Sequence, residues 1–105
     1  MKLGEKQELF VLLLPSLLLF AVEIGKQKEF TVRPGELWRP GDRRCHGMKI
    51  AIDLNFIDVE TGKLIKETEA HLKVGGFWES LHSLARWGGR FGDGNHYSLT
   101  HNGIK

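Results

Sequence analysis

The segment Arg44–Asn55, RCHGMKIAIDLN, places an aspartate in the middle of an aliphatic run and a histidine just before that run. Side chains alternate between the two faces of a strand. The segment therefore predicts a strand ending near Asp58 with one apolar face, made by Met48, Ile50, Ile52, Leu54 and Phe56. Asp53 belongs to the opposite face. His46 has the wrong parity to join Asp53 in a straight strand, so the two can act together only if the chain bends near Gly47.

The bulk composition is that of a soluble globular protein. With 105 residues, 41% hydrophobic and 27% charged, the chain suffices for one compact domain with a modest core. We expect a single domain over 1–105, with an N-terminal helix over 1–26 and an α+β core over 29–99. The net charge of +2 is small and the arginines are scattered, so we expect no nucleic-acid partner. The sequence leaves the oligomeric state open.

The apolar stretch Leu9–Val22, LFVLLLPSLLLFAV, has two interpretations. It is shorter than the ~20 residues that a membrane span needs, and the preceding leader has no net positive charge. We therefore expect a buried helix from about Leu3 to Gly25, without stable membrane insertion. Pro15 should kink this helix, since it removes a backbone hydrogen bond. A signal segment remains an alternative.

The rest of the chain predicts an α+β fold. Short strands are expected at Glu29–Val32 and Tyr97–Leu99, a helix at Phe77–Ala85, and a hairpin in which a turn at Glu60–Lys63 leads to Leu64–Ile65. Together they indicate a small, mostly antiparallel sheet with flanking helices.

The sequence contains candidate residues for three roles: metal binding, general-base catalysis and stabilisation of an oxyanion. His46, Asp53 and His96 offer two imidazoles and one carboxylate, the type of set that binds a catalytic zinc and leaves a fourth position for water. Asp93, three residues before His96, is a candidate general base. Arg39 is a candidate for stabilising the oxyanion. Each motif alone is common in unrelated chains, so the combination carries the hypothesis.

The combination resembles the M15 family of zinc peptidases, the D-Ala-D-Ala carboxypeptidases and phage L-alanyl-D-glutamate endolysins that cut peptidoglycan peptides. The family pattern S-x-H-x-x-G-x-A-x-D overlays residues 44–53. His46, Ala51 and Asp53 match it, whereas Arg44 stands where serine is usual and Lys49 where glycine is usual. The resemblance implies a hedgehog/DD-peptidase-like fold.

Two further blocks carry the resemblance. The blocks FWESL, at 77–81, and WGGRFGDGNHYSL, at 87–99, resemble the endolysin-type members closely. The segment GELWR, at 35–39, resembles the family strand that ends in Tyr-Arg and implies a substrate or transition-state role for Arg39. One departure is the short connection between Arg39 and His46, which in the family is longer and partly helical.

The resemblance implies a zinc-dependent enzyme that hydrolyses peptidoglycan stem peptides in phage or prophage lysis. It also implies that the domain over 1–105 is peptidase-like and that the core over 29–99 binds the metal. Zn²⁺ would be held by His46, Asp53 and His96, with Asp93 and Arg39 catalytic. Such an enzyme would be made in the cytoplasm and act at the cell wall after release. Two rivals remain: a non-catalytic wall-binding or virion protein with the same fold, and a small protein tethered to a membrane by residues 9–22.

The remaining candidates have plainer interpretations. Cys45, the single cysteine, excludes an internal disulfide and is expected to be a small, semi-buried residue. His71, His82 and His101 are expected at the surface. Trp78 is expected in the core, and Trp87 could belong either to the core or to a substrate groove.

Overall fold

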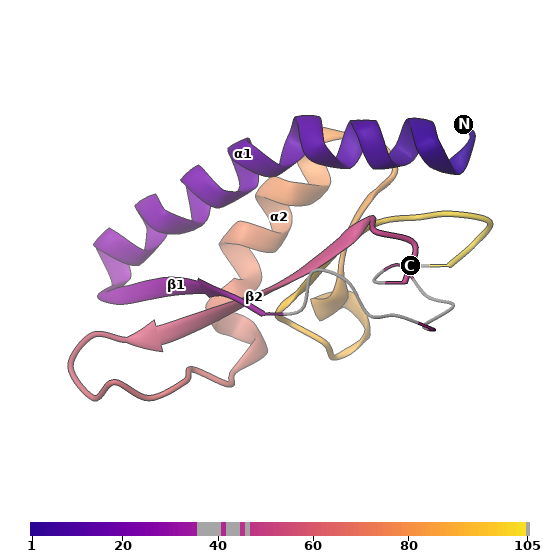
Figure 1. Cartoon of the computed structure of the whole chain (residues 1–105). Helices are drawn as coiled ribbons and strands as arrows, with labels where there is room; N and C mark the ends of the chain where they lie inside the picture. The colour runs from indigo at the N-terminus through magenta and orange to yellow at the C-terminus, as the bar shows by residue number, and fades with distance from the viewer. Residues whose placement is uncertain (36–40, 42–44, 46, 105) are drawn as a thin grey trace.

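The computed structural model describes residues 1–35, 41, 45 and 47–104. In chain order its elements are α1 (Leu3–Lys28), β1 (Phe30–Pro34), β2 (Ala51–Asp58), the 3-10 turn η1 (Thr68–His71), α2 (Leu72–Leu81), β3 (Ala85–Trp87), the 3-10 turn η2 (Gly88–Phe91) and β4 (His96–Leu99). Figure 1 shows α1 lying across α2 and the sheet.

The four strands form one antiparallel sheet in the order β1-β2-β4-β3. This arrangement confirms the predicted α+β class with a small antiparallel sheet and two helices. β2 and β4 are the central strands, although they lie more than 35 residues apart in the sequence. The long connection between them carries η1, α2 and β3, so the C-terminal half wraps back onto the strand that the opening segment forms.

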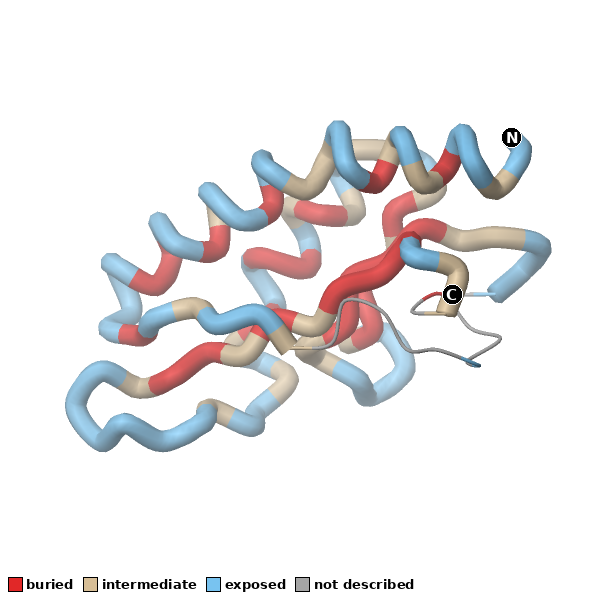
Figure 2. The backbone as a smooth tube through the Cα atoms, viewed as in Figure 1, coloured by how far each residue is buried: buried red, intermediate tan, exposed pale blue. Residues whose placement is uncertain are grey.

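The alternation predicted for β2 is confirmed. Ile52, Leu54 and Phe56 are buried, whereas Asp53 and Asn55 are half-buried; Figure 2 shows the buried run along β2. Ile52, Leu54 and Phe56 belong to the same core cluster as the buried residues of α1 and α2. The alternation therefore separates the packed face of the strand from the face that carries its polar residues.

The strand itself starts at Ala51 and not at Met48 as predicted. Residues 47–49 form a turn, in which Lys49 has a φ of 60° and the Ile50 amide donates to the Cys45 carbonyl over 3.0 Å. The chain thus turns directly before the strand. Cys45 is fully buried beneath this turn, and its thiol lies 3.3 Å from the Leu99 carbonyl oxygen.

α1 is one continuous helix of 26 residues that includes Pro15. It ends at Lys28, three residues after the predicted end, where Glu29 adopts a left-handed conformation with a φ of 62°. By length and composition alone α1 could cross a membrane, a property that core helices and signal sequences share. One side of α1 is buried in the core, at Phe10, Leu17, Ala21 and Ile24.

α2 covers Leu72–Leu81, so the helix predicted at Phe77–Ala85 is displaced toward the N-terminus. Two glycines, Gly75 and Gly76, obscured its start, because glycine disfavours helix. The helix ends at Leu81, and the backbone becomes extended at His82. The residues Ala85–Trp87, which were predicted as the end of the helix, instead pair with β4 as the strand β3. The predicted strand at Leu64–Ile65 is reduced to a single bridge between Ile57 and Leu64.

Trp87 lies between two glycines that leave room for its indole. A Cβ atom on Gly75 would lie 2.1 Å from Cδ2 of Trp87, and one on Gly89 would lie 2.1 Å from Cζ2. The indole Nε1 donates to the Gly94 carbonyl over 2.7 Å. Trp87 is 3% exposed, which places it in the core and resolves the two alternatives left open by the sequence. Trp78, fully buried as predicted, packs edge-on against Phe10.

The contact between α2 and Trp87 predicts opposite effects for two neighbouring substitutions. Gly75→Ala should lower the free energy of unfolding by about 1–3 kcal/mol, because the added methyl group overlaps the indole. Gly76→Ala is the matched control: nothing lies within 4 Å of its Cβ position, so it should raise stability by up to about 1 kcal/mol through helix propensity. Urea denaturation of both variants measures the difference, and equal effects would contradict the packing.

Candidate functional site

The central strands bring two of the predicted ligands together. Asp53 on β2 and His96 on β4 are register partners, and Oδ1 of Asp53 lies 3.5 Å from Nδ1 of His96. The His96 side chain is 8% exposed and that of Asp53 17%. Their neighbours Ile52 and Tyr97, also register partners, point into the core. The alternation therefore carries this polar pair onto the face opposite the core.

The distance between the two side chains fits joint coordination of a metal ion. Zinc binds carboxylate oxygen and imidazole nitrogen at about 2.0–2.2 Å, so neighbouring ligand atoms of a tetrahedral site lie about 3.3–3.5 Å apart. The observed 3.5 Å between Asp53 and His96 matches this edge length and exceeds the usual length of a hydrogen bond. A carboxylate and an imidazole are also donors that zinc prefers.

Asp93 lies in the loop that leads into β4. Its carbonyl oxygen accepts from the His96 amide over 3.2 Å, and its own amide donates to the Gly88 carbonyl over 2.9 Å. A Cβ atom on Gly88 would lie 2.2 Å from the Asp93 carbonyl oxygen and 2.8 Å from Cβ of His96. Gly88 thus allows the loop to close tightly against β4, and this closure fixes both predicted site residues relative to the sheet.

An ion pair between Glu79 and Arg90 connects the same loop to α2. Glu79 of α2 accepts from the Trp87 amide over 3.1 Å and from two nitrogens of Arg90 over 2.9 and 3.0 Å. The Arg90 guanidinium also lies 5.3 Å from the centre of the Trp87 ring. Glu79 and Arg90 were not singled out in the sequence, although both fall within the blocks that carry the family resemblance.

The other predicted site residues, His46 and Arg39, lie outside the described residues. The described chain approaches the pair at Gly35, whose amide donates to the Asp53 carbonyl over 2.7 Å. A Cβ atom on Gly35 would lie 2.8 Å from Cβ of Asp53. Within residues 1–35, 41, 45 and 47–104, no group of three His, Cys, Asp or Glu side chains could hold a metal ion. Of the three predicted ligands, Asp53 and His96 are the two that fall among the described residues.

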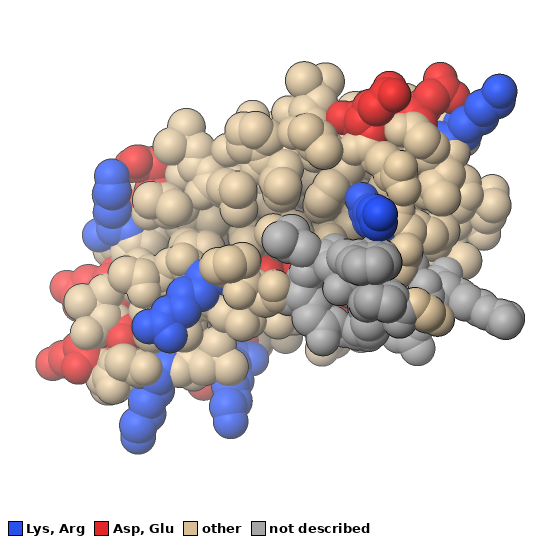
Figure 3. All heavy atoms as spheres, in the orientation of Figure 1, with Lys and Arg blue, Asp and Glu red and all other residues tan. Residues whose placement is uncertain are grey.

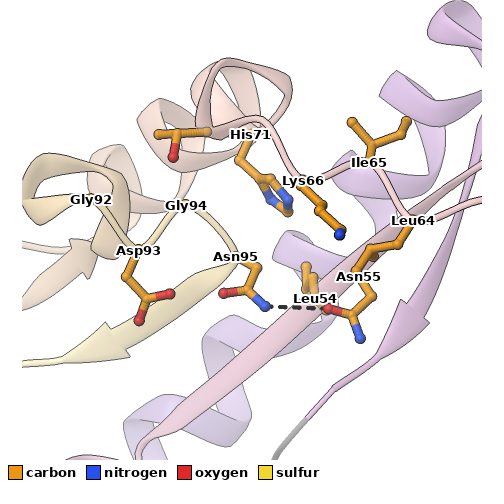
Figure 4. Close-up of a pocket in the computed structure, with 11 residues that line it drawn as sticks. Leu54, Asn55, Leu64, Ile65, Lys66, His71, Gly92, Asp93, Gly94 and Asn95 are labelled. Carbon is orange, nitrogen blue, oxygen red and sulfur yellow. Dashed lines mark hydrogen bonds between the residues drawn. The ribbon is translucent and has the colours of Figure 1, made fainter.

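A pocket of about 220 Å³ opens beside the loop, between the 64–68 segment and residues 92–95. Figure 4 shows His71 and Lys66 on one wall, with Asn95 bonded to Asn55 across the floor over 3.2 Å. The Asp93 carboxylate is directed away from His71. Asp93 lines this pocket, but neither Asp53 nor His96 does.

His71 was predicted at the surface, and this prediction is wrong. The residue is 3% exposed, its ring stacks on Phe56 with centroids 3.9 Å apart, and Nδ1 lies 2.7 Å from the Tyr97 hydroxyl. Burial lowers the pKa of His71 to about 4 and raises the pKa of Tyr97. The neighbours of His71 in the sequence are charged and therefore suggested a surface position. Only in the folded chain does the His71 ring of η1 pack against Phe56 of β2.

The other two histidines are partly buried rather than fully exposed. His82 accepts from the Leu84 amide over 3.0 Å at the end of α2. His101 lies 2.9 Å from Nζ of Lys6, which also donates to the Thr100 carbonyl over 3.0 Å. Both side chains therefore contact residues other than Asp53 and His96.

Comparison with known proteins identifies no family for this chain. No family model matches it, and neither the curated proteins nor the solved structures contain a significant match. The arguments for its function therefore come from its own residues.

The burial of neutral His71 predicts a stability that falls with acid. The pKa of His71 is about 4 in the folded chain and about 6.5 in the unfolded chain. Its contribution to the free energy of unfolding is therefore complete above pH 6.5 and is lost as the pH falls toward 4. The loss should reach about 3 kcal/mol. Urea denaturation between pH 7 and pH 4 measures it.

His71→Gln is the matched control, because an amide can still bond to the Tyr97 hydroxyl but does not titrate. The variant is expected to be less stable than the natural chain at pH 7 and to lose less stability on acidification. An equally steep pH dependence in both proteins would show that other groups cause it.

Proposed function

We propose that this protein is a zinc-dependent peptidase that hydrolyses peptide bonds in peptidoglycan stem peptides. The observation that carries the proposal is the pairing of Asp53 and His96 across β2 and β4, at a separation suited to two ligands of one tetrahedral zinc. His46 would be the third protein ligand. L-Ala-D-Glu endopeptidase and D-Ala-D-Ala carboxypeptidase activities both agree with this set, as does a phage or prophage setting.

The backbone at Lys49 gives independent support to the family resemblance. Lys49 occupies the position where the family pattern has glycine, and its φ of 60° lies in the left-handed region that favours glycine. This left-handed backbone would explain why the family has glycine at this position, although this chain has lysine there. This agreement concerns the turn that follows His46 and precedes β2.

The residues of this chain would have separate roles in hydrolysis of the peptide bond. Bound zinc would supply Lewis acidity, which favours ionisation of water and polarises the carbonyl of the scissile bond. Asp93, exposed and adjacent to β4, would take the proton of the attacking water and deliver it to the leaving amine as the C–N bond breaks. Arg39 would stabilise the negative charge that develops on the carbonyl oxygen.

The setting at the cell wall follows from the substrate. The enzyme would be made in the cytoplasm and would reach peptidoglycan after release, where the stem peptides are its partners. It would require neither nucleic acid nor stable insertion into a membrane. The buried side of α1, with Leu17 and Ala21 fully enclosed, supports a helix that stays with the sheet.

Metal binding tests the site directly. The purified chain should contain about one zinc per molecule by elemental analysis, and Asp53→Ala or His96→Ala should each remove it, because either change leaves two protein ligands. His82→Ala is the matched control, since His82 lies at the end of α2 and should not affect zinc content. A chain without stoichiometric zinc after loading and desalting would refute the metal site.

Cleavage of purified muropeptides tests the chemistry. Asp93→Asn should retain zinc and lower kcat by about 10²- to 10⁴-fold, because the amide cannot accept the proton of water. Glu60→Gln, which alters an exposed carboxylate in the turn after β2, should cleave normally. Zinc binding without cleavage by the natural chain would instead favour a non-catalytic wall-binding or virion protein, and partition into detergent would favour a membrane tether.

A further inference from the structure

The outward side of α1 is apolar although it faces solvent. We define the outer stripe as the exposed residues Val11, Leu12, Pro15, Leu18, Leu19 and Val22. The most exposed of them are Leu12, Val11 and Leu19, at 73%, 68% and 65%. Figure 3 shows the uncharged surface of α1 in tan, between charged residues near its two ends. Contiguous exposed apolar surface of this kind marks an interaction site more often than a bare surface.

The outer stripe is symmetric about its own centre. With 3.6 residues per turn, all of its members project within about 60° of the direction of Pro15. Leu12 and Leu18 lie three residues to either side of Pro15, and Val11 and Leu19 lie four residues to either side. In these two pairs an apolar side chain on one half is matched by an apolar side chain at the same distance on the other half, whereas Val22 is matched by Glu8. A helix surface with similar side chains at equal distances on both sides of its centre is suited to pairing with a second copy across a two-fold axis.

We propose that the outer stripe of α1 binds the outer stripe of a second copy of the chain, with the two helices antiparallel and the two-fold axis beside Pro15. In this arrangement Leu12 meets Leu18 of the second copy, and Val11 meets its Leu19. The interface is isologous, as in most dimers. This inference concerns the side of α1 that faces away from the core and does not rest on the proposed peptidase activity.

The charges at the ends of α1 select the antiparallel orientation. In a parallel pair Glu8 would meet Glu8 and Lys26 would meet Lys26. In the antiparallel pair Lys26 lies opposite Gly4 of the second copy, one helical turn from Glu8. Lys26 also lies 3.2 Å from Glu23 of its own helix. The antiparallel orientation therefore brings Lys26 toward Glu8 of the second copy, whereas the parallel orientation places like charges opposite each other at both ends.

The same charges disfavour a lipid surface as the occupant. Helices that lie on membranes usually border their apolar face with lysine and arginine, which attract anionic headgroups. The exposed charges at the two ends of α1 are balanced, with no excess of lysine: Lys2, Glu5 and Glu8 before the stripe, and Glu23, Lys26 and Lys28 after it. The apolar run from Val11 to Val22 is about 17 Å long, and its opposite side is held in the core by Leu17 and Ala21. A second protein surface suits this short stripe with balanced charges at its ends better.

A contact made by one helix face lies at the small end of specific interfaces, so dissociation in the micromolar range is expected. Sedimentation velocity from low micromolar to near-millimolar protein should show a reversible monomer–dimer equilibrium. Leu12→Glu combined with Leu19→Glu should weaken association by at least about tenfold. The control Val59→Glu changes an apolar residue that is 61% exposed in the turn after β2 and should leave the dimer unchanged.

Disulfide trapping tests the orientation. Pro15→Cys should crosslink to itself under mild oxidation, because the two copies meet at this position. Val22→Cys should not crosslink to itself but should crosslink to Glu8→Cys in a mixture, since these positions lie seven residues to either side of Pro15. The natural Cys45 is fully buried, and unfolding in excess alkylating reagent prevents it from forming a disulfide once it is exposed.

Several results would overturn the proposal. A chain that stays monomeric throughout the concentration range has no such dimer. A dimer insensitive to the paired Leu12 and Leu19 substitutions uses another surface, and efficient self-crosslinking of Val22→Cys indicates parallel helices. Stripe-dependent binding of a monomeric chain to phosphatidylcholine vesicles assigns the stripe to lipid. Circular dichroism of each variant establishes that loss of association does not reflect unfolding.

Discussion

The register between β2 and β4 is the constraint on which the rest of the structure depends. It places Ile52 opposite Tyr97 in the core and Asp53 opposite His96 on the other face. Because side chains alternate along both strands, one register satisfies the core and assembles the polar pair. A slip of one residue would carry the carboxylate into the apolar core and expose the isoleucine. The packing of the core and the chemistry of the candidate site are therefore set by the same backbone pairing.

The loop before β4 depends on a second layer of contacts. Trp87 enters a space that Gly75 and Gly89 leave open, and its indole bonds to the Gly94 carbonyl. Glu79 then ties the Trp87 amide to Arg90. These contacts link α2 to the start of β4, so the loop that carries Asp93 is supported at both ends. Glycines whose Cβ atoms would clash explain why a large aromatic residue can lie beside so tight a turn.

α1 has two apolar sides, and they have different structural roles. Phe10, Leu17 and Ala21 pack into the core, whereas the outer stripe faces solvent. This division explains why the sequence of the helix resembles both a buried core helix and a membrane segment. A helix that is apolar on all sides is expected to be covered on all sides. The fold covers one side only, and a second copy of the chain would cover the other.

The sequence by itself determined the elements that depend on local pattern. The alternation of Ile52, Asp53 and Leu54 indicated a strand with one polar face, and the apolar run at 9–22 indicated a helix. Interactions between residues distant in the chain could only be decided by the tertiary structure. They include the pairing of Asp53 with His96, the burial of His71 against Phe56, and the room that Gly75 leaves for Trp87. The physical reason is that periodicity records which face of an element is apolar, but not which distant segment packs against it.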